Sequence, residues 1–180
     1  MSELFRSSRL SFHAPSMDDL DALAAMWADP VAMRYVGDGT PWSRGKVQQR
    51  LERAITLHED RHMAFWTVRL IETGKTIGQA GIVPIEHNTQ DPECPIELGY
   101  RFGQVHWGKG YATEAARAVA AYTTDTAGPL ALERLIAVAF PDNAASCRVL
   151  ERTGFTHLGE TDDYYNVTLA LYELHAHAVG

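Results

Sequence analysis

A glycine-rich turn at residues 107–110, with the sequence Trp-Gly-Lys-Gly, constrains the fold of this chain more than any other segment. It lies between an alternating run at 96–102, which predicts a strand, and an alanine-rich run from about 111 to 127, which predicts a helix. Glycines let backbone N–H groups approach an anion closely, and the positive end of the following helix favours the same charge. The order of strand, turn and helix therefore predicts a phosphate-bearing ligand, with a purely structural tight turn as the alternative.

Composition excludes several classes of protein. The 180 residues carry 16 Lys and Arg against 23 Asp and Glu, a net charge of −7. This length predicts one domain, 1–180, and the acidic balance disfavours nucleic acid as a partner, because its binding needs a basic face. No apolar run approaches the roughly 20 residues of a membrane span, and the N-terminal residues lack the apolar core of a signal peptide. With only Cys94 and Cys147, too few for a disulfide framework, we expect a cytoplasmic protein with no membrane partner.

Hydrophobic periodicity and turn residues predict a mixed α/β domain. Ser16 and Asn143 are suitable helix N-caps, Gly154 suits a left-handed C-cap, and the continuous apolar run at 135–140 is typical of a strand covered on both faces. The predicted elements, in order, are a strand at 9–13, helices at 17–28 and 40–58, strands at 65–70, 76–83 and 96–102, a helix at 111–127, a strand at 135–140, a helix at 143–153, and strands at 155–158 and 164–174. One β-α-β unit therefore lies at the centre of the chain.

Two well-known phosphate motifs almost match the glycine-rich turn. Read as a P-loop, Gly103 to Lys109 fits G-x-x-x-x-G-K, but Gly110 stands where Ser or Thr must bind Mg²⁺. Read as a dinucleotide fingerprint, Gly108 and Gly110 lack the third glycine, because Thr113 occupies that place. An NTP- or dinucleotide-binding protein stays an alternative, although each motif lacks one of its required residues.

Three sequence blocks in and around the turn carry a family resemblance. They are Glu97-Leu98-Gly99-Tyr100, residues 107–115 (WGKGYATEA), and residues 143–146 (NAAS) with 149–155 (VLERTGF). In order and spacing these blocks resemble the GNAT superfamily of acetyl-CoA-dependent N-acetyltransferases, particularly the RimJ/RimL-like branch, which acetylates protein N-termini. The resemblance implies a single-domain GNAT fold of the α/β (α+β) class: a mixed, mostly antiparallel sheet with a central, splayed parallel β-α-β unit.

The resemblance also implies where coenzyme A binds. In the family, backbone amides of the glycine loop hold the pyrophosphate, which here assigns the donors to His106, Trp107, Gly108, Lys109, Gly110, Tyr111, Ala112 and Thr113, with Lys109 as a charge partner. Val105 stands where the family usually has Gln or Arg, which puts one side-chain contact in question and leaves the backbone amides of the loop unaffected. Main-chain groups near Tyr100, Arg101 and Phe102 are expected to pair with pantetheine as an added strand. Asn143 matches a pantetheine-contacting position, and its alternative role is an ordinary N-cap.

The chemistry implied by the resemblance needs a base for the amine and a proton for the departing thiolate. Glu97 is the candidate base, directly or through water, because burial on the cleft-lining strand would raise its pKa; alternatively it faces solvent. Many GNAT enzymes use a tyrosine seven residues after the asparagine as the acid, but Leu150 stands there. Ser146, which matches a thiol-contacting position, or water would act instead.

Four further observations concern the acceptor and metals. Asp162 to Tyr165 either form part of the acceptor wall or a solvated turn, and Trp42 is expected in the core rather than in that wall. If acidic residues surround the acceptor mouth, they would attract a cationic amine. His175 and His177 lack a third ligand, so we expect no metal.

The sequence therefore predicts an N-acetyltransferase that binds acetyl-CoA and an amine acceptor, either a peptide N-terminus or a small amine, in a ternary complex. The alternative is a GNAT-like domain that senses acyl-CoA without turnover. The sequence does not determine the oligomeric state; dimers are common in the family, so the resemblance is compatible with a homodimer.

Overall fold

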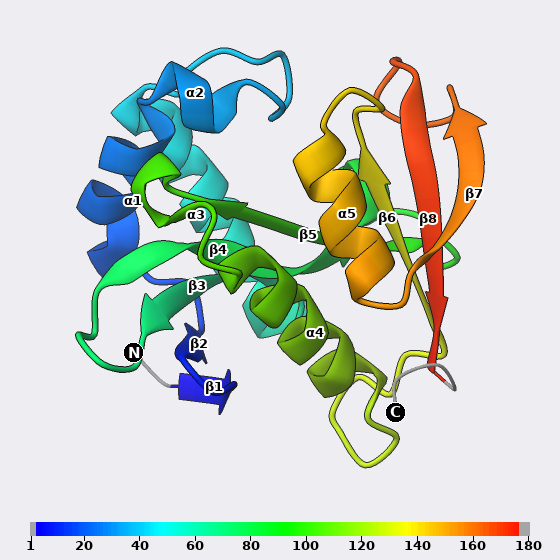
Figure 1. The fold of residues 1–180 in the computed structure, drawn as a ribbon. Helices are drawn as coiled ribbons and strands as arrows, with labels where there is room; N and C mark the ends of the chain where they lie inside the picture. Colours follow the sequence, from blue (N-terminus) through cyan, green and yellow to red (C-terminus); the bar gives the residue numbers. More distant parts are fainter. Residues whose placement is uncertain (1–2, 177–180) are drawn as a thin grey trace.

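Eight strands form a single mixed sheet in the computed structural model, which describes residues 3–176 (Figure 1). In spatial order the strands are β1 (Glu3–Arg6), β2 (Leu10–His13), β3 (Ala64–Leu70), β4 (Thr76–Pro84), β5 (Ile96–Phe102), β6 (Arg134–Ala139), β8 (Leu169–His175) and β7 (Thr156–Thr161). Every neighbouring pair is antiparallel except β5 and β6, which are parallel. The predicted, mostly antiparallel sheet with one central parallel pair is confirmed.

The parallel pair is splayed. β5 and β6 meet at one register position, Glu97 opposite Ile136. By contrast, β5 pairs with β4 along its whole length, from Pro84 opposite Ile96 to Gly78 opposite Phe102. The sheet therefore separates into two halves beyond Glu97, and the edge of β5 that faces β6 is left without strand partners.

Helices cover both faces of the sheet. They are α1 (Leu20–Trp27), α2 (Pro30–Met33), α3 (Arg44–Arg61), α4 (Tyr111–Thr124) and α5 (Ala144–Arg152), with short 3-10 turns at Met17–Asp19, Ile85–His87 and Gln104–His106. Leu98 and Phe102 of β5 share a core cluster with the alanines of α4, whereas Arg101 lies over Trp27 of α1. Because side chains alternate along a strand, α4 and α1 cover opposite faces of β5.

Local capping explains several helix boundaries. The Ser16 hydroxyl accepts from the amide of Asp18, the Asn143 side chain accepts from the amide of Ser146, and Gly154 is left-handed at φ 91°, all as predicted. The predicted second helix begins later than Thr40, at Arg44, because the Ser43 hydroxyl accepts the Lys46 amide and caps it there. It also ends later than His58, at Arg61.

Other predicted boundaries and elements were wrong or missing. The strand predicted at 164–174 begins only at Leu169, because Tyr165 and Asn166 are left-handed, with φ of 59° and 54°. The strand predicted at 155–158 runs from Thr156 to Thr161, and the helix predicted to 127 ends at Thr124, after which Asp125 leaves the helical conformation with ψ of 118°. Strand β1 and helix α2 were not predicted, and a helix of four residues offers too short a pattern for periodicity to detect.

The structure also bears on two of the expected absences. None of the helices within residues 3–176 is long and apolar enough to cross a bilayer. Over the same residues, no group of three or more His, Cys, Asp or Glu side chains is arranged to hold a metal ion. His175 lies 2.8 Å from Glu173, and His177 is outside the described residues.

Substitution of Gly81 tests how closely β3 and β4 approach each other. A Cβ at this position would lie 1.9 Å from the carbonyl oxygen of Ala64, so the strands would have to shift. We expect Gly81→Ala to lower the free energy of unfolding by about 2–3 kcal/mol, measured by urea denaturation. The matched control is Gly45→Ala in α3, where a Cβ meets nothing within 4 Å. Ala should raise stability there by about 0.5–1 kcal/mol. Equal stability of the two variants would contradict this account of the sheet.

Candidate active site

Side-chain hydrogen bonds connect the separated halves of the sheet on both faces. On the α5 side, the Tyr100 hydroxyl of β5 lies 2.9 Å from the Ser146 hydroxyl and donates to the Ser146 carbonyl at 3.1 Å. On the other side, the Tyr165 hydroxyl donates to Glu97 Oε2 at 2.5 Å. Glu97 and Tyr100 are three residues apart on one strand and so point to opposite faces. Together they flank the opening between β5 and β6.

Glu97 is buried, with 9% of its surface exposed. Burial raises the pKa of its carboxyl to about 7, and the nearby Glu86 adds to that rise, while the Tyr165 hydrogen bond lowers the pKa. The alternative that Glu97 faces solvent is therefore wrong. A carboxyl with this pKa can take up and release a proton near neutral pH.

Tyr165 lies in the loop between β7 and β8, where two hydrogen bonds to Glu86 hold it in place. Its amide donates to Glu86 Oε1 at 2.6 Å, and its hydroxyl accepts from the Glu86 amide at 3.1 Å. The hydroxyl proton is therefore directed at Glu97, and burial together with the Glu97 charge raises the pKa of Tyr165 above its ordinary value. The sequence predicts Tyr165 in a wall or a turn but does not reveal its partner Glu97, because the contact joins residues 68 positions apart.

The glycine loop leaves a run of unpaired amides at the N-terminus of α4. Gly108 and Gly110 are left-handed, with φ of 72° and 79°. The amides of His106 and Trp107 donate to Gly103 and Gln104 within the preceding 3-10 turn. Between residues 3 and 176, no backbone acceptor meets the amides from 108 to 113, since the first N–H groups of a helix have none within it. Of the predicted donors, those at Gly108, Lys109, Gly110, Tyr111, Ala112 and Thr113 are therefore free to bind an anion.

The side chains of the loop have different surroundings. His106 is buried, and burial followed by the charges of Lys75 and Lys109 lowers its pKa. The Trp107 indole donates to the carbonyl of Phe102 at 2.8 Å, which fixes the loop against the end of β5. Lys109 is exposed.

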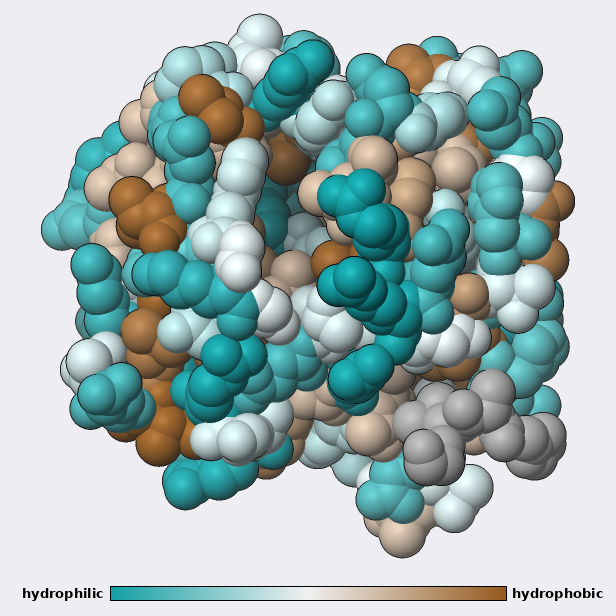
Figure 2. Space-filling model, viewed as in Figure 1, coloured by the Kyte–Doolittle hydropathy of each residue, from teal (hydrophilic) through white to brown (hydrophobic). Residues whose placement is uncertain are grey.

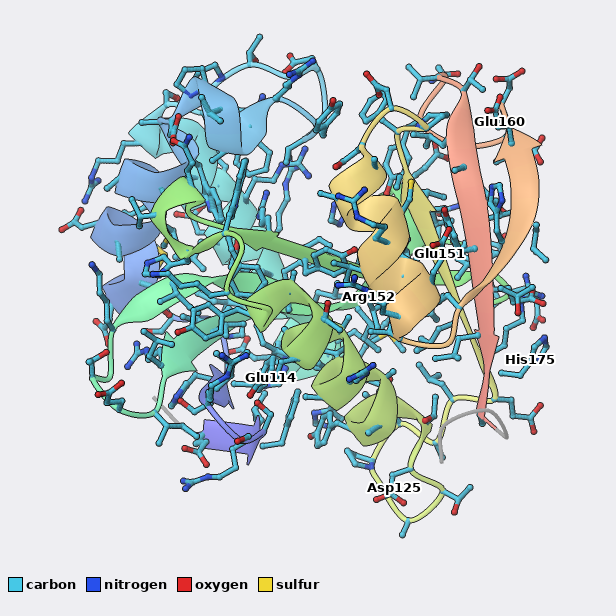
Figure 3. All side chains as sticks on the ribbon, in the orientation of Figure 1. Glu114, Asp125, Glu151, Arg152, Glu160 and His175 are labelled. Carbon is cyan, nitrogen blue, oxygen red and sulfur yellow. The ribbon has the colours of Figure 1, made fainter. Side chains whose placement is uncertain are left out.

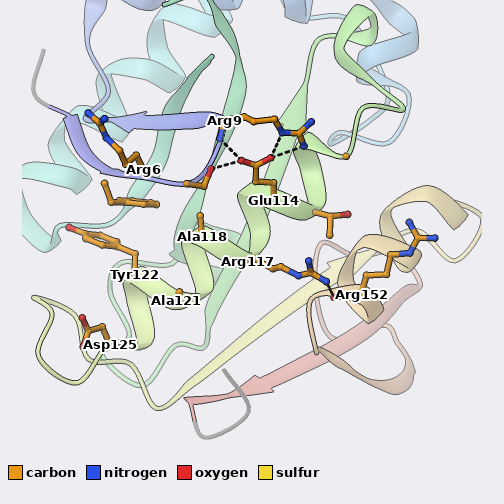
Figure 4. A pocket seen from close by; sticks show the side chains of 13 residues that line it. Arg6, Arg9, Glu114, Arg117, Ala118, Ala121, Tyr122, Asp125 and Arg152 are labelled. Carbon is orange, nitrogen blue, oxygen red and sulfur yellow. Dashed lines mark hydrogen bonds and ion pairs between the residues drawn. The ribbon is translucent and has the colours of Figure 1, made fainter. Parts of the chain in front are cut away.

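An ion pair anchors the glycine loop to the N-terminal hairpin (Figure 4). The Glu114 carboxylate accepts from the Arg9 side chain and from the Arg9 amide at 2.7 Å, and Arg9 Nη1 donates to the carbonyl of Lys109 at 3.1 Å. Burial would raise the pKa of Glu114, but the Ser7 hydroxyl, which donates to Glu114 Oε1 at 2.8 Å, and the Arg9 bonds together hold it below its usual range. The hairpin and α4 line an open hollow of about 940 Å³. Arg117 of α4 and Arg152 of α5 are among the residues that line it.

Arg152 lies at the C-terminal end of α5, beside α4 (Figure 3). Its carbonyl accepts from Arg117 Nη2 at 2.7 Å, which ties the two helices together. No carboxylate of the described residues forms an ion pair with Arg117 or Arg152. Both guanidinium groups are consequently available to an anion near the loop.

On the opposite face, aromatic rings surround Arg101. Its guanidinium carbon lies 4.5 Å from the ring centre of Trp42, 4.9 Å from Trp27 and 5.7 Å from Phe65. Trp42 is buried in the cluster formed by α1 and α3, as the sequence predicted. Figure 2 shows a hollow between the part of the surface over α1–α3 and the part over α5, with hydrophilic side chains along its edge.

Asn143 and Leu150 have structural surroundings on α5. The Asn143 side chain accepts from the amide of Ser146 at 3.3 Å, so it acts as the N-cap. Leu150, at the position of the family tyrosine, is buried in the main core. No tyrosine hydroxyl can act from that position, and the hydroxyls of Tyr100, Ser146 and Tyr165 form the hydrogen bonds on either side of the opening.

Comparisons with known proteins agree with this geometry. A family model described as an acetyltransferase (GNAT) domain matches residues 9–156. The uncharacterized N-acetyltransferase p20 of Bacillus licheniformis is 27% identical over 163 residues, which cover 90% of this chain and 87% of that protein.

Solved structures share the fold. A GNAT-family acetyltransferase from Bacillus anthracis superposes with a TM-score of 0.78 at 22% identity, covering 96% of this chain and 98% of its own. RimL, a ribosomal L7/L12 alpha-N-protein acetyltransferase in complex with coenzyme A, superposes with a TM-score of 0.77 at 16% identity, covering 97% and 98%. With most of the chain matched by the family model, and with the splayed strands and the glycine loop in place, the protein belongs to the GNAT family of acetyltransferases, which transfer an acyl group from acetyl-CoA.

Proposed function

We propose that the protein transfers the acetyl group of acetyl-CoA to a primary amine by direct attack of the bound amine in a ternary complex. The observation that carries this proposal is the buried carboxyl of Glu97 at the one point where β5 and β6 pair. With a pKa of about 7, it can accept a proton from an amine near neutral pH. A protein N-terminus, whose pKa is about 7.7–8.0, suits such a base better than lysine at about 10.4. We therefore propose a peptide N-terminus as the acceptor.

The glycine loop is the proposed site for the phosphates of coenzyme A. Its free amides from 108 to 113 lie at the N-terminus of a 14-residue helix, where the helix dipole also favours negative charge. Arg117 and Arg152 border the same hollow as Gly110 and Thr113 and add positive charge. The unpaired edge of β5 near Tyr100, Arg101 and Phe102 is the proposed partner for pantetheine.

The proposed roles in the reaction follow from the two bridges across the opening. Bound acetyl-CoA supplies the thioester carbonyl that the amine attacks. Glu97 removes the proton of the amine, and Tyr165 positions the Glu97 carboxylate. Ser146, whose hydroxyl is bonded to that of Tyr100, is the proposed donor of a proton to the thiolate. Burial raises the pKa of Tyr100, so its hydroxyl keeps its proton and can support Ser146 as a donor.

The RimJ/RimL-like branch is part of the proposal. RimL, which shares the fold, acts on the N-terminus of a ribosomal protein and binds coenzyme A. A cytoplasmic location suits such a substrate and is consistent with Cys94 and Cys147, which are both free thiols. Asn143 is proposed to contact pantetheine in addition to capping α5.

A non-catalytic acyl-CoA sensor is the second candidate, because buried Leu150 replaces the tyrosine that many family members use as the acid. The two candidates differ in turnover. Acetyl-CoA incubated with a panel of N-terminal peptides and small amines should release free thiol if the protein is an enzyme. A protein that binds acetyl-CoA and releases no thiol with any acceptor would be a sensor.

Gly108→Ala tests the glycine loop. An alanine at φ 72° is strained by about 1–2 kcal/mol. We expect it to displace the amides and weaken coenzyme A binding about tenfold or more, since a hydrogen bond to a charged group contributes about 1.5–3 kcal/mol. Titration calorimetry gives the affinity.

The matched control is Gly74→Ala in the turn between β3 and β4. Gly74 has φ 67°, and a Cβ at either glycine meets nothing within 4 Å. Both variants should lose similar stability, but Gly74→Ala should bind coenzyme A like the wild type. Equal affinities for all three proteins would argue against the loop as the phosphate site.

The pH dependence of turnover tests Glu97. Because the base must be ionised, kcat/KM should rise with pH and level off above about 7. Glu97→Gln should remove this rise and lower kcat/KM about a hundredfold or more, with the affinity for coenzyme A unchanged. A pH profile that Glu97→Gln leaves unaltered would exclude Glu97 as the base.

Tyr165→Phe tests the positioning role on the same profile. The Tyr165 hydrogen bond lowers the pKa of Glu97, so its loss should move the break to higher pH. Glu86→Gln should move the break to lower pH, because the Glu86 charge raises that pKa. Tyr164→Phe is the control and should leave the break in place.

A further inference from the structure

The cleft face of β5 has an acid at one end and an unneutralised cation at the other. Glu97, Gly99 and Arg101 point to the same face, since their positions differ by two. Phe65 of β3 fills the space left by the missing side chain of Gly99, where a Cβ would lie 2.7 Å from the ring. An aromatic surface therefore separates the Glu97 carboxyl from the Arg101 guanidinium.

Arg101 has a neutral partner in place of an acid. Its Nε and Nη2 both donate to Gln79 Oε1, at 3.2 and 2.7 Å, and Gln79 Nε2 donates to the Phe65 carbonyl at 3.4 Å, which fixes the amide. Nη1 has no acceptor between residues 3 and 176, and it is not among the atoms sealed from solvent. Burial, reinforced by the charge of Arg50, lowers the pKa of Arg101 to about 9, so the group is still cationic at neutral pH.

Further cations extend from Arg101 along α3. Arg50 and Lys46 lie over the Trp42 ring at 5.4 and 5.3 Å, and with Arg53 they line a hollow of about 500 Å³ that contains no acidic residue. None of these side chains forms an ion pair within the described part of the chain. Desolvation, followed by the charges of Arg50, Arg101 and Arg53, lowers the pKa of the neighbouring His87 to about 4, so His87 is neutral and the positive charge comes from α3 and Arg101.

Burying the charge of an arginine without an acidic partner costs free energy, and a bound anion would offset that cost. The planar guanidinium group is well suited to bind a carboxylate. We infer that Arg101, Arg50 and the α3 cations form an anion subsite for the acceptor, so that the preferred acceptor carries an acidic group some distance from its amine. This inference rests on the proposed function, which places the amine at Glu97. It also replaces the sequence-based expectation of an acidic acceptor mouth with a cationic one on the α3 side.

The distance between Glu97 and Arg101 predicts which acceptors can reach both residues. Arg101 lies four positions after Glu97 on β5, a span of about 13 Å at about 3.3 Å per residue. A free amino acid holds its amine and carboxylate far closer together than this. An extended peptide with Asp or Glu at its third or fourth residue can reach both ends.

Peptide binding tests the subsite independently of turnover. The full-length protein with bound coenzyme A is titrated with peptides of one length that carry Glu or the isosteric Gln at residue 2, 3 or 4. We expect Glu to improve the dissociation constant about tenfold at residue 3 or 4 and less at residue 2, because a hydrogen bond to a charged group is involved. No preference at any position, a preference for Lys, or tighter binding of free glutamate would overturn the inference.

Substitutions of Arg50 and Arg101 test whether these residues cause the preference for Glu. Arg50→Gln and Arg101→Lys should each reduce the preference for Glu over Gln at least threefold, with Arg50→Gln the safer variant because its side chain lies at the surface of the hollow. Arg44→Gln is the matched control on the same helix, since Arg44 already pairs with Asp21 at 2.7 Å and should leave the preference unchanged. A preference that survives both test variants would overturn the assignment. Selective binding of the acidic peptides without their acetylation would support the subsite while refuting the proposed transfer reaction.

Discussion

The rest of the site depends on the single pairing between β5 and β6. Backbone N–H and C=O groups in a sheet need partners, and two parallel strands would ordinarily supply them to each other along their length. Here pairing stops after Glu97 and Ile136, although both strands remain fully paired on their outer sides. The result is an opening within a stable sheet, with unpaired backbone groups at its edge that an extended ligand can complete.

Because side chains alternate along β5, the proposed site residues lie on both faces of the sheet at this opening. Even-numbered residues face α4 and α5, where Tyr100 meets Ser146, and odd-numbered residues face α1 and α3, where Glu97 meets Tyr165 and Arg101 is surrounded by aromatic rings. One short strand thereby presents the proposed base on one face and, on the other, Tyr100, whose hydroxyl bonds the proposed proton donor Ser146 of α5. The glycine loop follows directly from the end of β5, so the proposed phosphate site is fixed relative to both.

Much of this arrangement follows from local sequence. The limits of β5 agree with the alternating pattern at 96–102, and the cap of α5 agrees with Asn143, because each depends on neighbouring residues only. The face of Glu97 was not predictable, since alternation alone does not say which side is covered and both Glu97 and Leu98 are buried. Tyr165 was underestimated because its role arises from a left-handed turn and a partner on a distant strand. The Arg101 environment combines three segments far apart in sequence, so periodicity could not reveal it.

We propose that acetyl-CoA binds in the opening between β5 and β6, with its phosphates on the glycine loop. Amide hydrogen exchange, measured with and without acetyl-CoA, is the sharpest test of this binding mode because it reports on individual backbone groups. We predict increased protection of the amides from 108 to 113 and of at least one amide of β5 between Leu98 and Phe102. Protection confined to other surfaces, with both of these segments unchanged, would contradict the account.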